Sequence, residues 1–188
     1  MRLLAAAEQL LADEGLDALT VRRVADEVGT TTRAVYSLFG SKEGLLVALA
    51  SHAFDILLRK LTGQRLTGDP RADLAKAGLA FRAFALEHPA LFRLAIQREL
   101  PDPALAQEYA AAARRAFMGL EARVRQFVDV ADLDLDVHDA AVQYHALCEG
   151  LAAVELRGGL LASANTKPVW TDALANLVAG FASKRPGT

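Results

Sequence analysis

Residues 20–45 constrain the fold of this chain more than any other stretch, because they predict two short helices joined by a tight turn. Thr20 can open the first helix, since its hydroxyl oxygen can accept a hydrogen bond from a free backbone N–H. The apolar residues that follow recur at spacings of three and one and so share one helix face: Val21, Val24, Ala25 and Val28. Gly29 then ends this helix, where a left-handed residue costs least, and Thr31 can cap the next one.

The second of these helices separates apolar from polar residues. Val35, Leu38 and Phe39 are expected to face inward, and Gly40 ends the helix before Ser41 caps a third. A helix-turn-helix unit with a polar outward face predicts contact with duplex DNA. The candidate DNA-binding residues are Thr20, Arg22, Thr31, Thr32, Arg33, Tyr36, Ser37 and Lys42. A core position for Tyr36 and a merely solvated charge at Arg33 remain alternatives.

These 45 N-terminal residues resemble the tetracycline-repressor (TetR) family of transcriptional regulators. The residues that carry the resemblance are Thr20-Val21, Val24-Ala25, Gly29, Tyr36, Phe39, Ser41-Lys42-Glu43 and Leu45. The resemblance implies an all-helical homodimer that binds a palindromic operator in double-stranded DNA and releases it when a small-molecule effector binds the C-terminal domain. The sequence enters its first helix almost at once, so minor-groove contacts from a basic N-terminal arm are not expected.

The rest of the chain also reads as helical, which makes the predicted fold class all-α with about nine helices. Capping residues, Gly and Pro place these helices at about residues 2–14, 20–28, 31–39, 42–61, 70–87, 90–97, 104–130, 137–156 and 168–183. Asp69 before Pro70 and Asp102 before Pro103 are expected caps. Residues 1–46 form the predicted DNA-binding domain, and residues 47–188 the predicted ligand-binding and dimerisation domain.

Composition limits the remaining possibilities. One cysteine among 188 residues excludes an intrachain disulfide, which fits a cytoplasmic protein, and no long uncharged apolar run predicts a membrane span. The net charge of −2 is unusual for a DNA-binding protein. The positions of the charges therefore matter more than their sum. Arg22, Arg33 and Lys42 lie near the expected DNA face, whereas the acidic residues of the first helix do not.

A second, shorter resemblance concerns the C-terminal half. Residues 84–94 and 148–156 are similar to segments of TetR-type regulators whose C-terminal domain is named for a Trp-His-Gly motif, although Cys148-Glu149-Gly150 departs from that triplet. Apolar helices with a few polar groups predict a ligand cavity. Its candidate residues are Phe81, Phe84, His88, Phe92, Tyr109, Phe117, His145 and Glu149. His138, His145 and Glu149 share a helix side, and a helix-surface pair is favoured there over a metal site; Cys148 is expected to be a small buried hydrophobe.

The last two helices each carry an apolar stripe. By analogy with the family, the stripes are predicted to form a four-helix dimer interface, with packing inside one subunit as the alternative. The candidate interface residues are Tyr144, Leu151, Trp170, Leu174, Leu177 and Phe181.

The sequence predicts a ligand-responsive DNA-binding regulator and no enzyme, since it contains no nucleophile triad, phosphate-binding Gly loop or paired metal motif. No cofactor is expected. Two other hypotheses stay open: an effector-independent DNA-binding or helical interaction protein, and a helical small-molecule enzyme.

Overall fold

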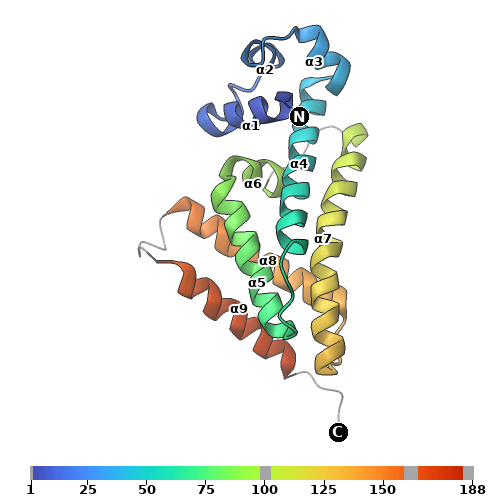
Figure 1. Ribbon diagram of the computed structural model, residues 1–188, viewed down its shortest axis with the longest axis vertical. Helices are drawn as coiled ribbons and strands as arrows, with labels where there is room; N and C mark the ends of the chain where they lie inside the picture. Colours follow the sequence, from blue (N-terminus) through green and yellow to red (C-terminus); the bar gives the residue numbers. More distant parts are fainter. Residues whose placement is uncertain (1, 98–102, 159–164, 184–188) are drawn as a thin grey trace. The chain divides into compact units, whose positions relative to one another are not determined.

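The computed structural model describes residues 2–97, 103–158 and 165–183, with the backbone alone for residues 103–106. Within those ranges the chain forms α-helices and no strand, which confirms the predicted fold class (Figure 1). Each helix lies within one or two residues of its predicted bounds; the expected Asp102 cap falls outside the described residues. The helices are α1 (Arg2–Glu14), α2 (Val21–Glu27), α3 (Thr32–Phe39), α4 (Lys42–Thr62), α5 (Pro70–Glu87), α6 (Pro89–Ile96), α7 (Pro103–Ala131), α8 (Val137–Arg157) and α9 (Lys167–Ala182).

The contacts divide the chain into two units. The first comprises Met1–Ile56 and His88–Arg114, and the second comprises Leu57–Glu87 and Arg115–Thr188. Helices α4 and α7 each run through both units, so neither unit is continuous in sequence. The domain boundary expected between residues 46 and 47 falls inside α4 and stays a prediction.

The first unit is built around the N-terminal helices. Val21, Ala25 and Val35 are buried together, and Leu3 and Phe39 pack against them half-buried. Because these residues come from α1, α2 and α3, burying them holds the three short helices as one body. Isolated helices of seven and eight residues would be marginal in water.

Helix α6 completes this side of the first unit by packing against α1 (Figure 1). His88 precedes α6, and its Nδ1 lies 2.8 Å from a carboxylate oxygen of Glu8 on α1. The other Glu8 oxygen lies 3.8 Å from Nε2 of His52 on α4. One carboxylate therefore connects three elements of this unit.

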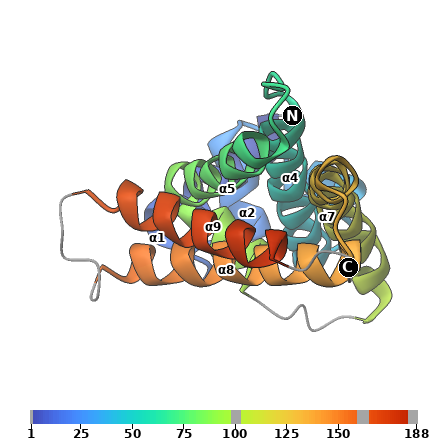
Figure 2. The ribbon, with the colours of Figure 1, turned by 90° about the horizontal axis from the view of Figure 1, so that it is seen from below.

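The second unit packs α5 against α8 and α9, which run side by side (Figure 2). Gly78 permits the close approach, because a Cβ at this position would lie 2.5 Å from a methyl group of Leu174 and 2.7 Å from the Tyr144 hydroxyl. The Tyr144 hydroxyl donates a hydrogen bond to the backbone carbonyl of Leu74. Burial raises the pKa of Tyr144 well above its ordinary value, so this donor stays protonated.

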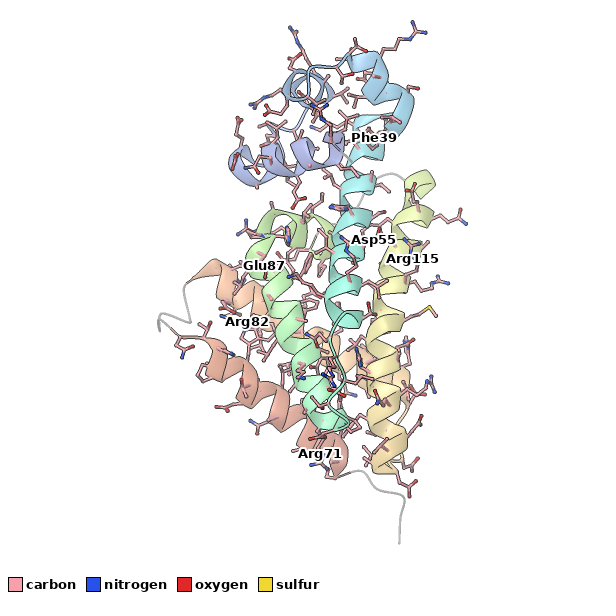
Figure 3. The ribbon with its side chains drawn as sticks, viewed as in Figure 1. Phe39, Asp55, Arg71, Arg82, Glu87 and Arg115 are labelled. Atoms are coloured by element: carbon pink, nitrogen blue, oxygen red, sulfur yellow. The ribbon has the colours of Figure 1, made fainter. Side chains whose placement is uncertain are left out.

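A polar cluster ties the same three helices together. Arg82 projects from α5 toward α8 and α9 (Figure 3), and its Nε lies 3.0 Å from a carboxylate oxygen of Glu155. Thr166 and Trp170 also donate to this carboxylate, the indole N–H over 2.8 Å. Desolvation by itself raises the pKa of Glu155, but the hydrogen bonds from Arg82, Thr166 and Trp170 outweigh it and leave the pKa below its ordinary value.

None of the described helices is both long enough and apolar enough to cross a bilayer.

Candidate DNA-reading face and ligand-domain site

The backbone of the α2–α3 unit follows the predicted capping pattern. The Thr20 hydroxyl accepts the backbone N–H of Arg23 at 3.3 Å, and the Thr31 hydroxyl accepts that of Ala34 at 3.2 Å. Gly29 between them has φ = +67°, a conformation that side chains rarely adopt. Two capped helices and a left-handed glycine therefore fix the turn.

Ser41 confirms the third predicted cap. Its hydroxyl accepts the backbone N–H of Gly44 at 3.0 Å, directly after Gly40 at φ = +72°. The cap holds the first turn of α4 and places Lys42, which is half-buried, at its first residue. A cation beside free backbone N–H groups suits a phosphate contact.

The outward side of α3 is polar, as predicted. Thr32, Arg33 and Ser37 are exposed, and the Tyr36 side chain is 52% exposed, which excludes a core position for it. The predicted inward set is correct for Val35, which is fully buried, and for Phe39, which is half-buried.

The prediction for Leu38 is wrong, because 67% of this residue is exposed. In a helix of eight residues, Val35 and Phe39 already fill the side that faces α1 and α2. Leu38 instead borders a surface hollow with Arg2, Leu3 and Leu4. Helix α3 therefore presents the large apolar side chain of Leu38 beside its polar ones.

The two arginines of α2 differ in how closely they are ion-paired. Arg22 is exposed, and its Nε lies a loose 3.9 Å from a carboxylate oxygen of Asp26. Arg23 forms a two-bond pair with Glu14 of α1, one bond measuring 2.6 Å, and this pair lowers the pKa of Glu14 below its ordinary value. Of the two guanidinium groups, Arg22 is the one available to a phosphate, which is how the sequence analysis assigned it.

Four of the predicted ligand-binding residues come together in the second unit. The ring of His145 lies edge-on to Phe81 at 5.7 Å and to Phe117 at 6.1 Å between centroids. Its Nε2 lies 3.6 Å from a carboxylate oxygen of Glu149 one turn away. Desolvation lowers the pKa of His145 more than Glu149 raises it, so the imidazole is largely neutral at pH 7. A neutral imidazole between two aromatic rings can both donate and accept hydrogen bonds.

The other predicted ligand residues lie elsewhere. Phe84 is fully buried in the second unit. Phe92 is fully buried in the first, where His88 bonds to Glu8 and the Tyr109 hydroxyl donates to the carbonyl of Ala95. The structure thus assigns structural contacts to His88 and Tyr109.

The partner of His138 was not predicted from the sequence. Nδ1 of His138 lies 2.7 Å from a carboxylate oxygen of Glu121 on α7, and this hydrogen bond raises the pKa of His138. Phe117 lies edge-on to His138 at 5.6 Å and edge-on to His145 at 6.1 Å between ring centroids. Only the packing of α7 on α8 brings Glu121 and His138 together, and no local spacing signals it. Among the described residues, no three His, Cys, Asp or Glu side chains are grouped to hold a metal ion.

The predicted dimer residues divide into two groups. Tyr144, Trp170, Leu174 and Phe181 are buried within the chain, with the Trp170 indole bonded to Glu155. Leu151 and Leu177 are half-buried. The alternative reading, packing inside one subunit, therefore describes the four buried side chains, and an interface on α8 and α9 would use their outer sides. Cys148 is buried as predicted, and burial raises the pKa of its thiol to about 12.

Comparison with known proteins agrees with this architecture. Residues 3–49 match a family profile described as bacterial regulatory proteins of the tetR family, and residues 74–177 match one described as a tetracyclin repressor-like C-terminal domain. An uncharacterized HTH-type transcriptional regulator of Mycobacterium tuberculosis is 29% identical over 174 residues, which cover 89% of this chain and 74% of the relative.

Solved structures share the whole fold. A Rhodococcus protein of unknown function superposes with a TM-score of 0.81 at 28% identity, covering 96% of this chain and 94% of the other. A TetR family transcriptional regulator from Thermus thermophilus, PfmR, gives a TM-score of 0.69 at 22% identity, covering 95% and 98%. The two matched profiles span the capped α2–α3 unit and the helices around Glu155 and His145, so this chain belongs to the TetR family of DNA-binding transcriptional regulators.

Proposed function

We propose that this chain is a dimeric, ligand-responsive repressor whose α3 helix reads a palindromic operator. The observation that carries the proposal is the exposed polar side of α3, which the capped turn and the buried Val35 hold in place. A second copy of the chain would bring a second α3 to the next major groove of the duplex, about 34–36 Å away. Such a protein acts where the DNA is, in the cytoplasm.

Individual roles follow from position on α3 and α4. Thr32 and Arg33 stand in the first turn of α3, the end that reaches base edges in helix-turn-helix proteins. Tyr36 and Lys42 are proposed to contact phosphates, and Thr20, Arg22, Thr31 and Ser37 are proposed as further polar contacts. Phosphate contacts position the protein on any duplex, and base contacts choose the sequence.

Binding measurements separate these roles. A selection from a randomised duplex library identifies the preferred sequence, and fluorescence anisotropy then compares that duplex with a random one at low salt. Lys42→Ala should weaken both complexes alike and make the salt dependence shallower, whereas Arg33→Ala should change the selected sequence, at about 1–3 kcal/mol of discrimination per lost base contact.

Arg125→Gln, at an exposed position in the second unit, serves as the control. It should change neither the affinity for either duplex nor the selected sequence. If the purified protein binds no duplex at low ionic strength, or if Arg33→Ala leaves the selected sequence unaltered, the assignment of α3 as reader fails.

The effector is proposed to bind beside Phe81, Phe117, His145 and Glu149. Two aromatic edges and a neutral imidazole suit a largely apolar ligand with one hydrogen-bonding group. Such a ligand releases DNA only if it binds the DNA-free arrangement more tightly, and moving the population fully requires about 5 kcal/mol of differential affinity.

A screen of small apolar compounds by thermal unfolding should find ligands that stabilise the protein and weaken its complex with the selected duplex. His145→Phe should abolish both effects of such a ligand while leaving DNA binding intact. Compounds that never alter DNA binding would instead favour an effector-independent DNA-binding protein.

A further inference from the structure

We propose that a hollow between α1 and α6 binds a small carboxylate with an apolar body, such as an aromatic or short-chain acid. The hollow belongs wholly to the first unit and is therefore separate from the His145 cluster of the second. Its lining residues are Leu11, Gly15, Leu16, Ala90, Arg93 and Leu94.

The size of the hollow matches one ring or a short alkyl chain. Its volume is about 190 Å³, and an apolar cavity of about 150 Å³ is known to admit one benzene molecule. Leu11 and Leu94 form buried walls, while Leu16 and Ala90 are half-buried. Four aliphatic side chains offer water few partners there, so an apolar group gains by replacing it.

The charge at the hollow comes from Arg93. This residue is exposed in the last turn of α6, and its guanidinium has no ion-pair or hydrogen-bond partner among the described residues. The acidic side chains at the nearby end of α1 are engaged, since Glu14 pairs with Arg23 and Asp13 accepts from Gln9. A planar guanidinium binds a carboxylate through two parallel hydrogen bonds, which fixes the charge of the ligand as negative.

The location gives such a ligand a route to the reading helices. Helix α1 packs on α6 at the hollow and also on α2 of the DNA-reading unit. Gly15, at φ = +81°, ends α1 at the rim of the hollow. A ligand in the hollow would therefore contact the C-terminal end of α1, and α1 is the helix against which α2 packs.

The test uses the full-length protein with benzoate as probe and benzamide as its neutral match. With the leucine methyl groups isotopically labelled, nuclear Overhauser contacts from the ring protons should reach Leu11, Leu16 and Leu94. A ligand of this size should bind with a Kd on the order of 1 mM.

Arg93→Gln removes the charge and keeps the hollow, and should weaken benzoate about tenfold while leaving benzamide unchanged. Ala90→Leu fills the hollow and keeps the charge, and should abolish binding of both probes. The matched controls are the exposed Arg71→Gln at the start of α5 (Figure 3) and the exposed Ala111→Leu on α7, neither of which should matter.

Ring contacts with other leucines, or an equal effect of Arg93→Gln and Arg71→Gln on benzoate, would overturn the proposal. So would undiminished binding of benzoate to Ala90→Leu. None of these results depends on DNA binding, so they leave the proposed operator recognition untouched.

Discussion

Single residues show both what local pattern predicts and where it stops. A helical period groups Val35, Leu38 and Phe39 on one face, yet the structure buries the first and exposes Leu38 to 67%. The period gives the angle of a side chain about the axis, while the shape of the neighbouring helices decides how wide the buried side is. In a helix of eight residues, the width of the buried side therefore determines whether a residue such as Leu38 is buried or exposed.

The exposure of Leu38 predicts a large difference from its neighbour three residues away. Leu38→Ala should change the free energy of unfolding by less than about 0.5 kcal/mol, because little of its surface is buried. Val35→Ala should cost about 2 kcal/mol, because it leaves a cavity between three helices. Urea denaturation of both variants checks this, and equal costs would mean that Leu38 is packed inward after all.

Arg82, Thr166 and Trp170 all donate hydrogen bonds to the Glu155 carboxylate, so its loss should destabilise the fold strongly. Glu155→Gln leaves the Arg82 guanidinium facing an uncharged amide inside the α5–α8–α9 packing. The expected cost at pH 7 is about 2–4 kcal/mol in urea denaturation. Glu149→Ala removes a half-buried carboxylate with only a loose 3.6 Å contact to His145; it serves as the comparison and should cost much less.

The pKa of Glu155 also gives this cost a pH dependence. Because the folded pKa lies below the ordinary 4.5, the ionised carboxylate stabilises the fold above that pH and loses this contribution as the pH falls through the folded value. The difference between wild type and Glu155→Gln should therefore be constant from pH 7 down to about pH 5 and shrink below it. A difference that grows in acid would contradict the assigned hydrogen bonds.

At the scale of elements, the sequence predicted the bounds of each described helix to within one or two residues. Helix starts and ends are written in local chemistry, since Thr20, Thr31 and Ser41 cap their helices and Gly29 and Gly40 adopt the left-handed turn. Contacts between helices were not predictable in the same way. Glu121 and His138 meet across α7 and α8, and their spacing of seventeen residues carries no signal of it.

The Thr31 cap of α3 predicts a measurable effect on stability. Thr31→Ala should destabilise the protein by about 1 kcal/mol, because the backbone N–H of Ala34 loses its acceptor. Thr31→Ser should retain most of the stability, since it keeps the hydroxyl. Thr30→Ala next to it is the control, because its side chain caps no helix. Chemical denaturation of the three variants measures their free energies of unfolding. A loss for Thr30→Ala as large as that for Thr31→Ala would count against the cap.

At the scale of the whole molecule, an apolar stripe does not say which partner covers it. The stripe of Trp170, Leu174 and Phe181 was assigned to a second subunit, and the structure covers it with the chain's own helices. Both solutions bury the same residues, so periodicity cannot separate them. The same limit applies to the ligand residues, because aromatic side chains suit a filled core and a cavity equally well.

The proposed dimer therefore needs the other side of α8. Val142, Ala146 and Gly150 are exposed at spacings of four and so form one outward row. A Cβ at Gly150 would meet nothing within 4 Å of its own chain, which leaves room for a close approach by a partner. In a two-fold interface the same patch is used by both subunits, so each substitution occurs twice in the interface.

Gly150→Glu should accordingly convert the dimer to monomers in sedimentation velocity, because each subunit would bury an unpaired carboxylate in the interface. Circular dichroism should stay unchanged, since the position is open in the single chain. The matched control, Ala122→Glu on the exposed side of α7, should remain dimeric. Loss of the dimer should also cost the affinity for a palindromic duplex while sparing weak binding to a half-site, because each subunit keeps its own α3. A dimeric Gly150→Glu alongside a monomeric Ala122→Glu would move the interface from α8 to α7.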